Sequence, residues 1–250
     1  MLASERLSTA GPRLVFIHGF TQTRESWRPV ASRFAHDHEV ILLDAPHHGA
    51  SHNVDVTLPE AAHLISAVVN NGVCIGYSMG GRMALHAALD HPDAFDALVL
   101  VSATPGIDDP DERAARRDAD ALLAHDLEQM GTNAFLDAWL AQPMFRHLRP
   151  DPADIAARRQ NPAGALARSL RMCGTGCQES LWPRLAGLTM PVLLISGEDD
   201  HKFTDIACRI HASLPQARLE IIEGAGHSPH LEQPDAFTAV VAEWLAEIGR

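Results

Sequence analysis

The sequence predicts an α/β protein whose mostly parallel sheet is flanked by helices. Short apolar runs alternate with longer amphipathic stretches, and this alternation has one long break. The runs are rich in Val, Ile and Leu without strict alternation, which is typical of parallel strands buried on both faces. Strands are expected at 13–19, 39–44, 72–76, 97–103, 191–197 and 217–224. Helices are expected near 25–35, 58–70, 80–90, 204–213 and 234–248.

The alternation of strands and helices breaks between about residues 106 and 183. This stretch is rich in arginine and alanine and contains no strand candidate, and the Asp-Pro-Asp sequence at 109–111 is typical of the start of a helix. Later prolines predict several short helices. A helical insertion between two strands predicts a lid over the carboxyl edge of the sheet. We therefore expect a core at 1–105 and 184–250 and a helical lid at 106–183.

Length and charge restrict the class of protein. A chain of 250 residues suits one sizeable domain, and its 46% hydrophobic and 21% charged residues are ordinary for a globular protein. A formal net charge of −12 argues against nucleic acid or an anionic membrane surface as a general partner. A small anionic substrate would therefore need a local cluster of arginines. The sequence predicts no particular oligomeric state.

The sequence also gives no sign of a targeting, membrane or metal-binding segment. The first residues, MLASERLSTAG, contain no apolar stretch typical of a secretory signal, and no apolar run approaches the roughly 18 residues of a membrane span. The four cysteines are too few for a dense disulfide framework, and Cys173 and Cys177 have no second pair of ligands. We expect a cytoplasmic enzyme with reduced thiols and no metal or other cofactor.

Residues 72–89 read GVCIGYSMGGRMALHAAL, which predicts a strand, a sharp turn and a helix. The turn contains G-x-S-x-G with Ser78 at its centre, the pattern of a nucleophile elbow. A serine at such a strained apex requires that Gly76 and Gly80 have no Cβ to collide with the turning backbone. The N–H groups that begin the helix favour negative charge beside the serine. The alternative is a glycine-rich turn that only ends a strand.

A serine that acts as a nucleophile or base needs an imidazole oriented by a carboxylate. On this architecture the acid and then the histidine follow the serine in the chain. His227 lies on the glycine-rich loop after the last expected strand, and nearby His230 is expected to face the final helix. The segment GEDDHKF follows the strand at 191–197, and position alone does not choose between Asp199 and Asp200.

A developing oxyanion needs two backbone donors. The elbow supplies the N–H of Met79, and the loop after the first strand is expected to supply that of Phe20. His18, at the end of that strand, is interpreted as a structural histidine that bonds the loop backbone. The histidines of PHHGASH, residues 46–52, resemble a metal cluster, but no carboxylate accompanies them, so we expect no metal there.

Several motifs resemble those of one enzyme family. They are FIHGFTQTRESW, GYSMGGRMALHAAL, SATPGI, ERAARRDAD, MCGTGCQESLW, GEDDHKF and GAGHSPHLEQP. Together they are similar to MenH, a family of α/β-hydrolase-fold enzymes in menaquinone biosynthesis, from about residue 13 to 240. The HG, G-x-S-x-G and G-x-G-H pieces occur throughout the superfamily. The GFTQT, GYSMGGR, ERxxR, GTGxQxSLW and GExDxKF pieces are narrower signals.

The resemblance implies a lyase that eliminates pyruvate from 2-succinyl-5-enolpyruvyl-6-hydroxy-3-cyclohexene-1-carboxylate to give 2-succinyl-6-hydroxy-2,4-cyclohexadiene-1-carboxylate. It implies a triad of Ser78, Asp200 and His227 that starts proton abstraction. By the same resemblance, the substrate-binding residues are Arg82, Arg116, Arg159, Tyr77 and Trp139. The family pattern DxPGHGxS reads DAPHHGAS here, so His47 stands where the family has glycine near the pocket entrance.

The competing interpretation keeps the fold and changes the chemistry. A serine esterase or a carbon–carbon bond hydrolase would use the same triad for attack or water activation, whereas a ligand receptor would not need it. Arginine binds carboxylates in a bidentate geometry, and a pocket for neutral esters does not need such residues. Arg82, one helical turn after Ser78, has the clearest physical case. The helix around 113–117 also suits a solvated surface, and the motif match favours only Arg116 as functional.

Overall fold

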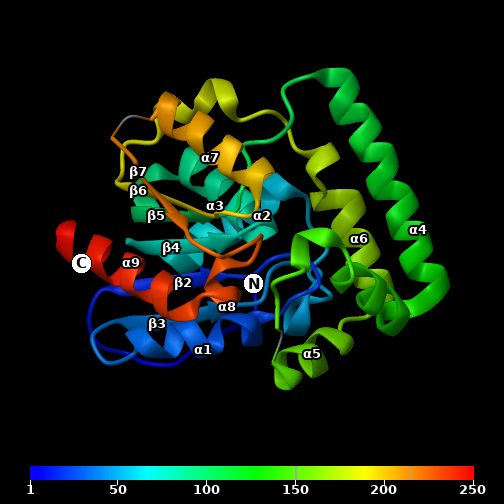
Figure 1. Ribbon diagram of the computed structural model, residues 1–250, viewed down its shortest axis with the longest axis horizontal. Helices are drawn as coiled ribbons and strands as arrows, with labels where there is room; N and C mark the ends of the chain where they lie inside the picture. The colour runs from blue at the N-terminus through cyan, green and yellow to red at the C-terminus, as the bar shows by residue number, and fades with distance from the viewer. Residues whose placement is uncertain (150, 215) are drawn as a thin grey trace.

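The computed structural model describes residues 1–149, 151–214 and 216–250 (Figure 1). A seven-stranded sheet forms its centre, in the order β1-β3-β2-β4-β5-β6-β7. Neighbouring strands are parallel except for β1 and β3. The strands are β1 (Ser4–Arg6), β2 (Arg13–Ile17), β3 (Glu39–Leu43), β4 (Gly72–Tyr77), β5 (Phe95–Val101), β6 (Val192–Gly197) and β7 (Arg218–Ile222). With helices on both sides of this sheet, the predicted α/β architecture is confirmed.

The six strands expected from apolar runs are all present, and the sequence prediction missed only β1. Every residue of β4 is buried, as a central parallel strand requires. The three residues of β1 are polar or charged and only partly covered, so they carry no apolar signal. β1 pairs antiparallel with β3 at the edge of the sheet, with Ser4 opposite Leu43.

Alternate residues of the strands face opposite sides of the sheet, and each side has its own core. Val15 and Cys74 pack with residues of α2, α3 and α7. Phe16 and Ile75 pack on the other face with residues of α1 and α9. These core helices, with the short α8, are α1 (Arg28–Ala31), α2 (Leu58–Val69), α3 (Met79–Asp90), α7 (His201–Ser213), α8 (Pro229–Glu232) and α9 (Pro234–Glu247). The site residues therefore start from a sheet that is buried on both faces.

The lid, our name for residues 106–183, contains α4 (Pro110–Leu140), α5 (Pro152–Arg159) and α6 (Ala163–Cys173). α4 begins where the Asp-Pro-Asp sequence predicted a helix, spans 31 residues and consists of two helical segments joined across a kink at Gly131 (φ 78°, ψ 165°). The shorter α5 and α6 follow the later prolines, as predicted. Pro110 and Pro152 each stand at the first helical position, where proline starts a helix instead of breaking it. The residue boundaries between core and lid stay a prediction.

The lid has a small hydrophobic core of its own. Leu127 and Phe135 of α4 pack against Leu166 and Leu170 of α6. Figure 1 shows these two helices side by side, beyond one edge of the strands. Within the described ranges, no helix combines the length and the apolar character needed to cross a membrane.

Candidate active site

Ser78 lies at a sharp turn between β4 and α3, with φ 50° and ψ −108°. This conformation is costly for a residue with a side chain, and it holds the hydroxyl above the end of the strand. A Cβ on Gly76 would lie 2.7 Å from the Gly80 carbonyl oxygen, and one on Gly80 would overlap the Ile17 carbonyl oxygen. The turn is thus possible only with glycine at both positions, as the sequence predicted.

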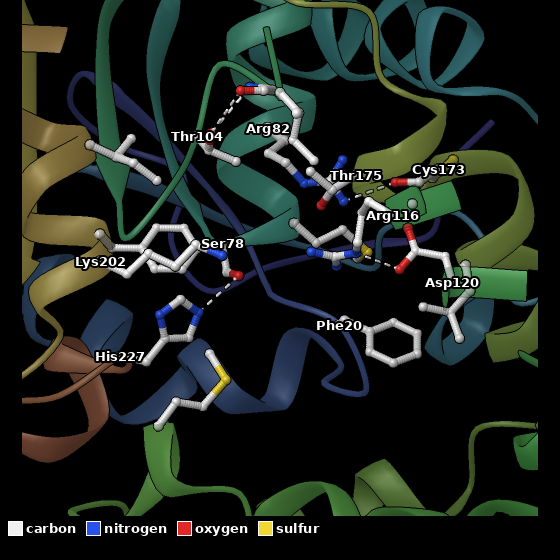
Figure 2. Close-up of a pocket in the computed structure, with 18 of the residues that line it drawn as sticks. Phe20, Ser78, Arg82, Thr104, Arg116, Asp120, Cys173, Thr175, Lys202 and His227 are labelled. Carbon is white, nitrogen blue, oxygen red and sulfur yellow. Dashed lines mark hydrogen bonds and ion pairs between the residues drawn. The ribbon is translucent and has the colours of Figure 1, made fainter. Parts of the chain in front are cut away.

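Figure 2 shows Ser78 and His227 pointing toward each other. The Nε2 atom of His227 is 3.1 Å from Ser78 Oγ, and its Nδ1 atom is 2.6 Å from Asp200 Oδ2. Each of the three residues follows the carboxyl end of a strand, namely β4, β6 and β7. The structure therefore brings the predicted triad into one hydrogen-bonded row. Its catalytic role stays a prediction.

The two neighbouring aspartates, which position alone did not separate, have different partners. Asp200 Oδ2 faces His227, whereas Asp199 Oδ2 lies 2.8 Å from Nε2 of His147 and 3.5 Å from Nη2 of Arg146. His147 and Arg146 belong to the lid. Asp199 therefore contacts the lid instead of the triad histidine, in keeping with the choice of Asp200 from the family motif.

Glu232 fixes the loop that carries His227, and sequence reasoning did not identify it. Its carboxylate accepts hydrogen bonds from the backbone N–H groups of Gly226 and Ser228, the residues on either side of His227. The hydroxyl groups of Tyr77 and Ser228 are 2.7 Å apart, which adds a second tie to the same loop. The pairing of Glu232 depends on how the loop folds back on α8, so the sequence contains no local signal for it.

His230 does not take part in the triad. Its ring lies 4.1 Å from that of Trp27 and 4.5 Å from that of Tyr77, measured between ring centroids, and it also contacts Phe237 of α9. Its side chain is completely buried, and burial holds its pKa well below the usual value. The expectation that His230 faces the final helix is confirmed.

The predicted oxyanion donors are the backbone N–H groups of Phe20 and Met79. Met79 is the first residue of α3, so its N–H has no acceptor in a preceding helical turn. Both residues line the cavity beside Ser78. These positions suit a site that accepts developing negative charge. Their role in stabilising an oxyanion stays a prediction.

His18 has the structural position that was predicted for it. Its Nε2 accepts from the N–H of Ala45 at 3.1 Å, so the proton is on Nδ1, which donates to the Gly19 carbonyl oxygen at 2.8 Å. Complete burial lowers its pKa to about 4. His48 packs at an angle on both His18 and Phe20, and burial, reinforced by His18, lowers its pKa to about 3. These two neutral rings lie behind the Phe20 loop.

His47 adopts the left-handed conformation, with φ 66°. Glycine, which the family has at this position, adopts the left-handed conformation freely. The loop keeps that conformation here although the residue is a histidine. Its buried ring is fixed by a 3.1 Å hydrogen bond between Nε2 and the Val56 carbonyl oxygen. Among the described residues, no group of histidine, cysteine and acidic side chains is arranged to hold a metal ion.

One cavity of about 890 Å³ joins the triad to the lid. Ser78, Asp200 and His227 line it from the core, and α4, α5 and α6 contribute the facing wall. Tyr77 and Trp139, the predicted aromatic residues, both line this cavity. The chain therefore brings its candidate reacting groups and its candidate binding groups into one cavity.

Tyr77 and Trp139 shape different parts of this cavity. Burial raises the pKa of the Tyr77 hydroxyl, which stays protonated beside Ser228. Trp139 stacks on Phe135 and meets Phe20 edge-on, with ring centroids 5.8 and 5.3 Å apart. It therefore forms an apolar wall of α4 that faces the loop carrying Phe20.

Arg82 points from α3 into the cavity and reaches the returning end of the lid (Figure 2). Its Nη1 donates to Oε1 of Gln178 at 3.0 Å, and its Nη2 donates to the Cys173 carbonyl oxygen at 2.8 Å. Burial lowers its pKa to about 10, so it keeps its charge at neutral pH. Within the described residues, no carboxylate forms an ion pair with this guanidinium. The cation is therefore held by neutral acceptors.

Arg116 lines the same cavity and is held by its own helix. Its Nε donates to Oδ1 of Asp120 at 2.8 Å, one turn further along α4 (Figure 2). The buried Asp120 also accepts from the N–H of Gly176. Gln178 and Asp120 are two residues that sequence reasoning missed. Gln178, in the motif GTGCQESLW, contacts Arg82, and Asp120, in the motif ERAARRDAD, contacts Arg116.

The structure corrects the choice of Arg159. Arg158 is 2% exposed, lines the cavity and donates to Oδ2 of Asp154 at 2.7 Å. Arg159 lies outside the cavity lining and pairs with the exposed Asp137. Successive side chains on an α-helix point about 100° apart, so only one of the two adjacent arginines can face inward. In α5 that residue is Arg158.

A serine on a strained strand-to-helix turn, followed by an acid and a histidine after later parallel strands, defines the α/β-hydrolase class. The family model described as "Alpha/beta hydrolase family" matches residues 14–240, and the chain belongs to this family. A thermophilic esterase from Thermogutta terrifontis is 22% identical with a TM-score of 0.84, covering 100% of this chain and 94% of its own, a likeness in fold alone.

Within this class, the chain is similar to proteins named for one reaction. A putative 2-succinyl-6-hydroxy-2,4-cyclohexadiene-1-carboxylate synthase from Bacillus subtilis is 37% identical over 96% of this chain and 92% of the relative. The synthase of that name from an Enterobacter strain is 32% identical over 94% and 92%. The structure of MenH from S. aureus superposes with a TM-score of 0.92 at 28% identity, covering 99% of each chain. The resemblance to the MenH family is confirmed.

Proposed function

We propose that this chain is a 2-succinyl-6-hydroxy-2,4-cyclohexadiene-1-carboxylate synthase. It eliminates pyruvate from 2-succinyl-5-enolpyruvyl-6-hydroxy-3-cyclohexene-1-carboxylate. The observation that carries the proposal is identity of 37% with a relative of that name along nearly the whole of both chains. The cavity supports it, because arginines from core and lid line the same space as Ser78.

The proposed reaction starts with removal of a proton from the ring carbon beside the succinyl carbonyl. His227 takes the proton of the Ser78 hydroxyl, and Ser78 Oγ takes the ring proton. Asp200 holds the imidazole in the tautomer that leaves Nε2 free to accept. The electron pair left on ring carbon 2 forms a double bond to carbon 3, the existing double bond moves to carbons 4 and 5, and the carbon–oxygen bond on carbon 5 breaks. The enolpyruvate that leaves picks up a proton and becomes pyruvate.

Negative charge develops on the succinyl carbonyl oxygen while the proton is removed. The N–H groups of Phe20 and Met79 are proposed to stabilise this charge, since such preorganised donors act most strongly where water is excluded. The buried position of Met79 and the apolar ring of Trp139 nearby support this role.

The substrate carries three carboxylates, one each on the ring, the succinyl group and the enolpyruvyl group. A chain with a net charge of −12 repels such a molecule unless the cavity is locally positive. Arg82, which neutral acceptors hold, supplies such a charge, and Arg116 and Arg158 present guanidinium groups that also pair with aspartates. A guanidinium matches a carboxylate in geometry. We propose that these three arginines hold the substrate.

The direct test incubates the purified protein with the enolpyruvyl substrate and follows pyruvate through a coupled dehydrogenase assay. We expect pyruvate release that depends on Ser78, with Ser78→Ala as the matched control. Absence of pyruvate, together with rapid cleavage of simple esters, would favour the esterase alternative and overturn the proposal.

The variant Arg82→Lys separates a substrate-binding role of Arg82 from a structural one. An ammonium keeps the charge but loses the paired donor geometry, so we expect kcat/KM for the anionic substrate to fall roughly ten- to a hundredfold, or about 1.5–3 kcal/mol. Turnover of a small neutral ester, measured beside it, should change much less. Equal losses on both substrates, with a lower melting temperature, would assign Arg82 to holding Gln178 and the lid.

A further inference from the structure

The chain contains a single lysine among 20 Lys and Arg residues, and that lysine is Lys202. It is the second residue of α7, two positions after Asp200, and its side chain lines the cavity. Every other basic position in the chain that carries a permanent charge is arginine. The one lysine of the chain therefore lies beside the candidate triad.

Lys202 is also the one cavity cation without an anionic or carbonyl partner among the described residues. The cavity-lining cations are Arg82, Arg116, Arg158, Arg209 and Lys202. Each of the four arginines donates to a carboxylate, an amide or a backbone carbonyl of the protein. Lys202 Nζ instead lies 5.7 Å from the ring centroid of Phe203. Its hydrogen-bonding capacity is therefore free for a ligand.

Figure 2 places Lys202 at one end of the cavity. It lies on the same side of Ser78 as His227, whereas Arg116 and Asp120 lie on the other side. The ring of Phe203, over which the ammonium sits, packs 4.5 Å from that of His227. A substrate whose reacting carbon is at Ser78 would thus have Arg116 on one side and the ammonium of Lys202 on the other.

This distribution of charge matches how the substrate divides in the proposed reaction. The retained product carries two carboxylates, and the departing enolpyruvyl group carries one. The bond that breaks is on ring carbon 5, across the ring from carbon 2, which loses its proton, so the departing group points away from Ser78. The fragment with one carboxylate fits the end of the cavity with one free cation.

We propose that Lys202 binds the carboxylate of the departing enolpyruvyl group and holds pyruvate after the carbon–oxygen bond has broken. This inference rests on the proposed function. An ammonium on a flexible stem suits a group that must leave, because it makes a point-charge contact without the fixed fork of a guanidinium. Lys202 is in this view a specificity-determining residue for the leaving group.

Product inhibition tests the proposal. We would compare the wild type with Lys202→Met, which keeps side-chain length, and Lys202→Arg, which keeps charge. Loss of a charge-assisted contact should raise the inhibition constant of pyruvate roughly tenfold in Lys202→Met. Inhibition by the cyclohexadiene product should stay within about twofold, and Lys202→Arg should restore part of the affinity for pyruvate. Arg33→Met removes one exposed charge next to α9 and is the matched control.

A second measurement does not depend on turnover. Because Lys202 is the only lysine, reductive methylation of the untagged protein with ¹³C-formaldehyde labels one side chain besides the terminal amine. Titration with pyruvate should move the resonance of the labelled Lys202 in the wild type. Acetate at the same concentration and ionic strength should move it less.

The outcomes separate this inference from the proposed function. Equal inhibition of wild type and Lys202→Met by pyruvate, or an equal loss for both products, would overturn the role of Lys202 alone. A Lys202 resonance that pyruvate leaves unmoved would overturn it as well. A wild type that releases no pyruvate from the substrate would refute the proposed function.

Discussion

At the carboxyl edge of the sheet, Ser78, Asp200 and His227 each follow a parallel strand, whereas Arg116 and Arg158 belong to helices of the lid. The edge positions its side chains through the backbone ladder and one strained turn. The lid positions its arginines through aspartates one turn away on the same helix. The difference teaches that the candidate reacting atoms depend on the sheet, while the lid's candidate binding charges depend on local ion pairs.

The largest effect should come from the edge. Ser78→Ala and His227→Ala should each lower turnover roughly ten-thousandfold or more, with an almost unchanged melting temperature, because neither side chain supports the core. The double variant should be little worse than either single one, since the residues act as a unit. Additive losses would contradict a coupled pair; steady-state kinetics with thermal melts decides between them.

The two adjacent aspartates sharpen the comparison within one dipeptide. Asp200→Asn should lower turnover roughly ten-thousandfold, because the amide no longer fixes the tautomer of His227. Asp199→Asn weakens only a partly exposed contact with His147. It should lower turnover little and lower the free energy of unfolding by less than about 1 kcal/mol. The reverse order of the two turnover losses would move the triad acid to Asp199.

The two adjacent arginines of α5 make the same comparison inside the lid. Arg158→Met leaves the buried carboxylate of Asp154 without its cation and should lower the free energy of unfolding by about 3–5 kcal/mol. Arg159→Met removes an exposed pair and should change it by less than about 0.5 kcal/mol. Urea unfolding measures both. Adding Asp154→Asn to Arg158→Met should recover part of the loss, and equal effects of the single variants would contradict this account.

The smallest effect concerns acid stability behind the Phe20 loop. The pKa of His48 is about 3 in the folded protein and about 6.5 unfolded, so the unfolded chain binds the extra proton. The stability that neutral His48 contributes is complete above pH 6.5 and is lost as the pH falls toward 3. At pH 5 the loss is about 2 kcal/mol. His18, with a pKa of about 4, acts in the same direction.

The measurement compares unfolding of the wild type and His48→Phe at pH 7.5 and at pH 5. The free-energy difference between the two proteins should shift by about 2 kcal/mol in favour of the variant at the lower pH. A difference that does not vary with pH would show that His48 is not the source.

Much of the edge could be predicted from the sequence because its signals are local. A buried parallel strand reads as an apolar run, and the elbow reads as two glycines around Ser78. β1 was missed because a three-residue edge strand needs no apolar residues. Asp199 and Asp200 were separable only through the family motif, since which carboxylate faces His227 depends on the turn after β6.

The lid was less predictable because its signals are ambiguous. A mixture of arginine and acidic residues fits a solvated helix as well as a cavity wall. The sequence alone therefore could not show which of Arg158 and Arg159 faces the cavity, because that depends on how α5 is rotated about its axis. The start of α4 was predictable from the Asp-Pro-Asp sequence, but its kink at Gly131 was not. That the ammonium of Lys202 lacks a protein partner could be recognised only once the partners of the neighbouring cations were known.

The chain leaves the sheet after β5 and returns at β6, two strands that are hydrogen-bonded neighbours, with Leu98 beside Val192. The whole lid is therefore one closed loop whose ends lie side by side. The entropy of closing such a loop grows only with the logarithm of its length, about 0.6 kcal/mol for each doubling. A sheet of this kind can thus carry lids of very different size at nearly constant chain entropy. In this protein, the lid can therefore change in length while Ser78, Asp200 and His227 stay in register.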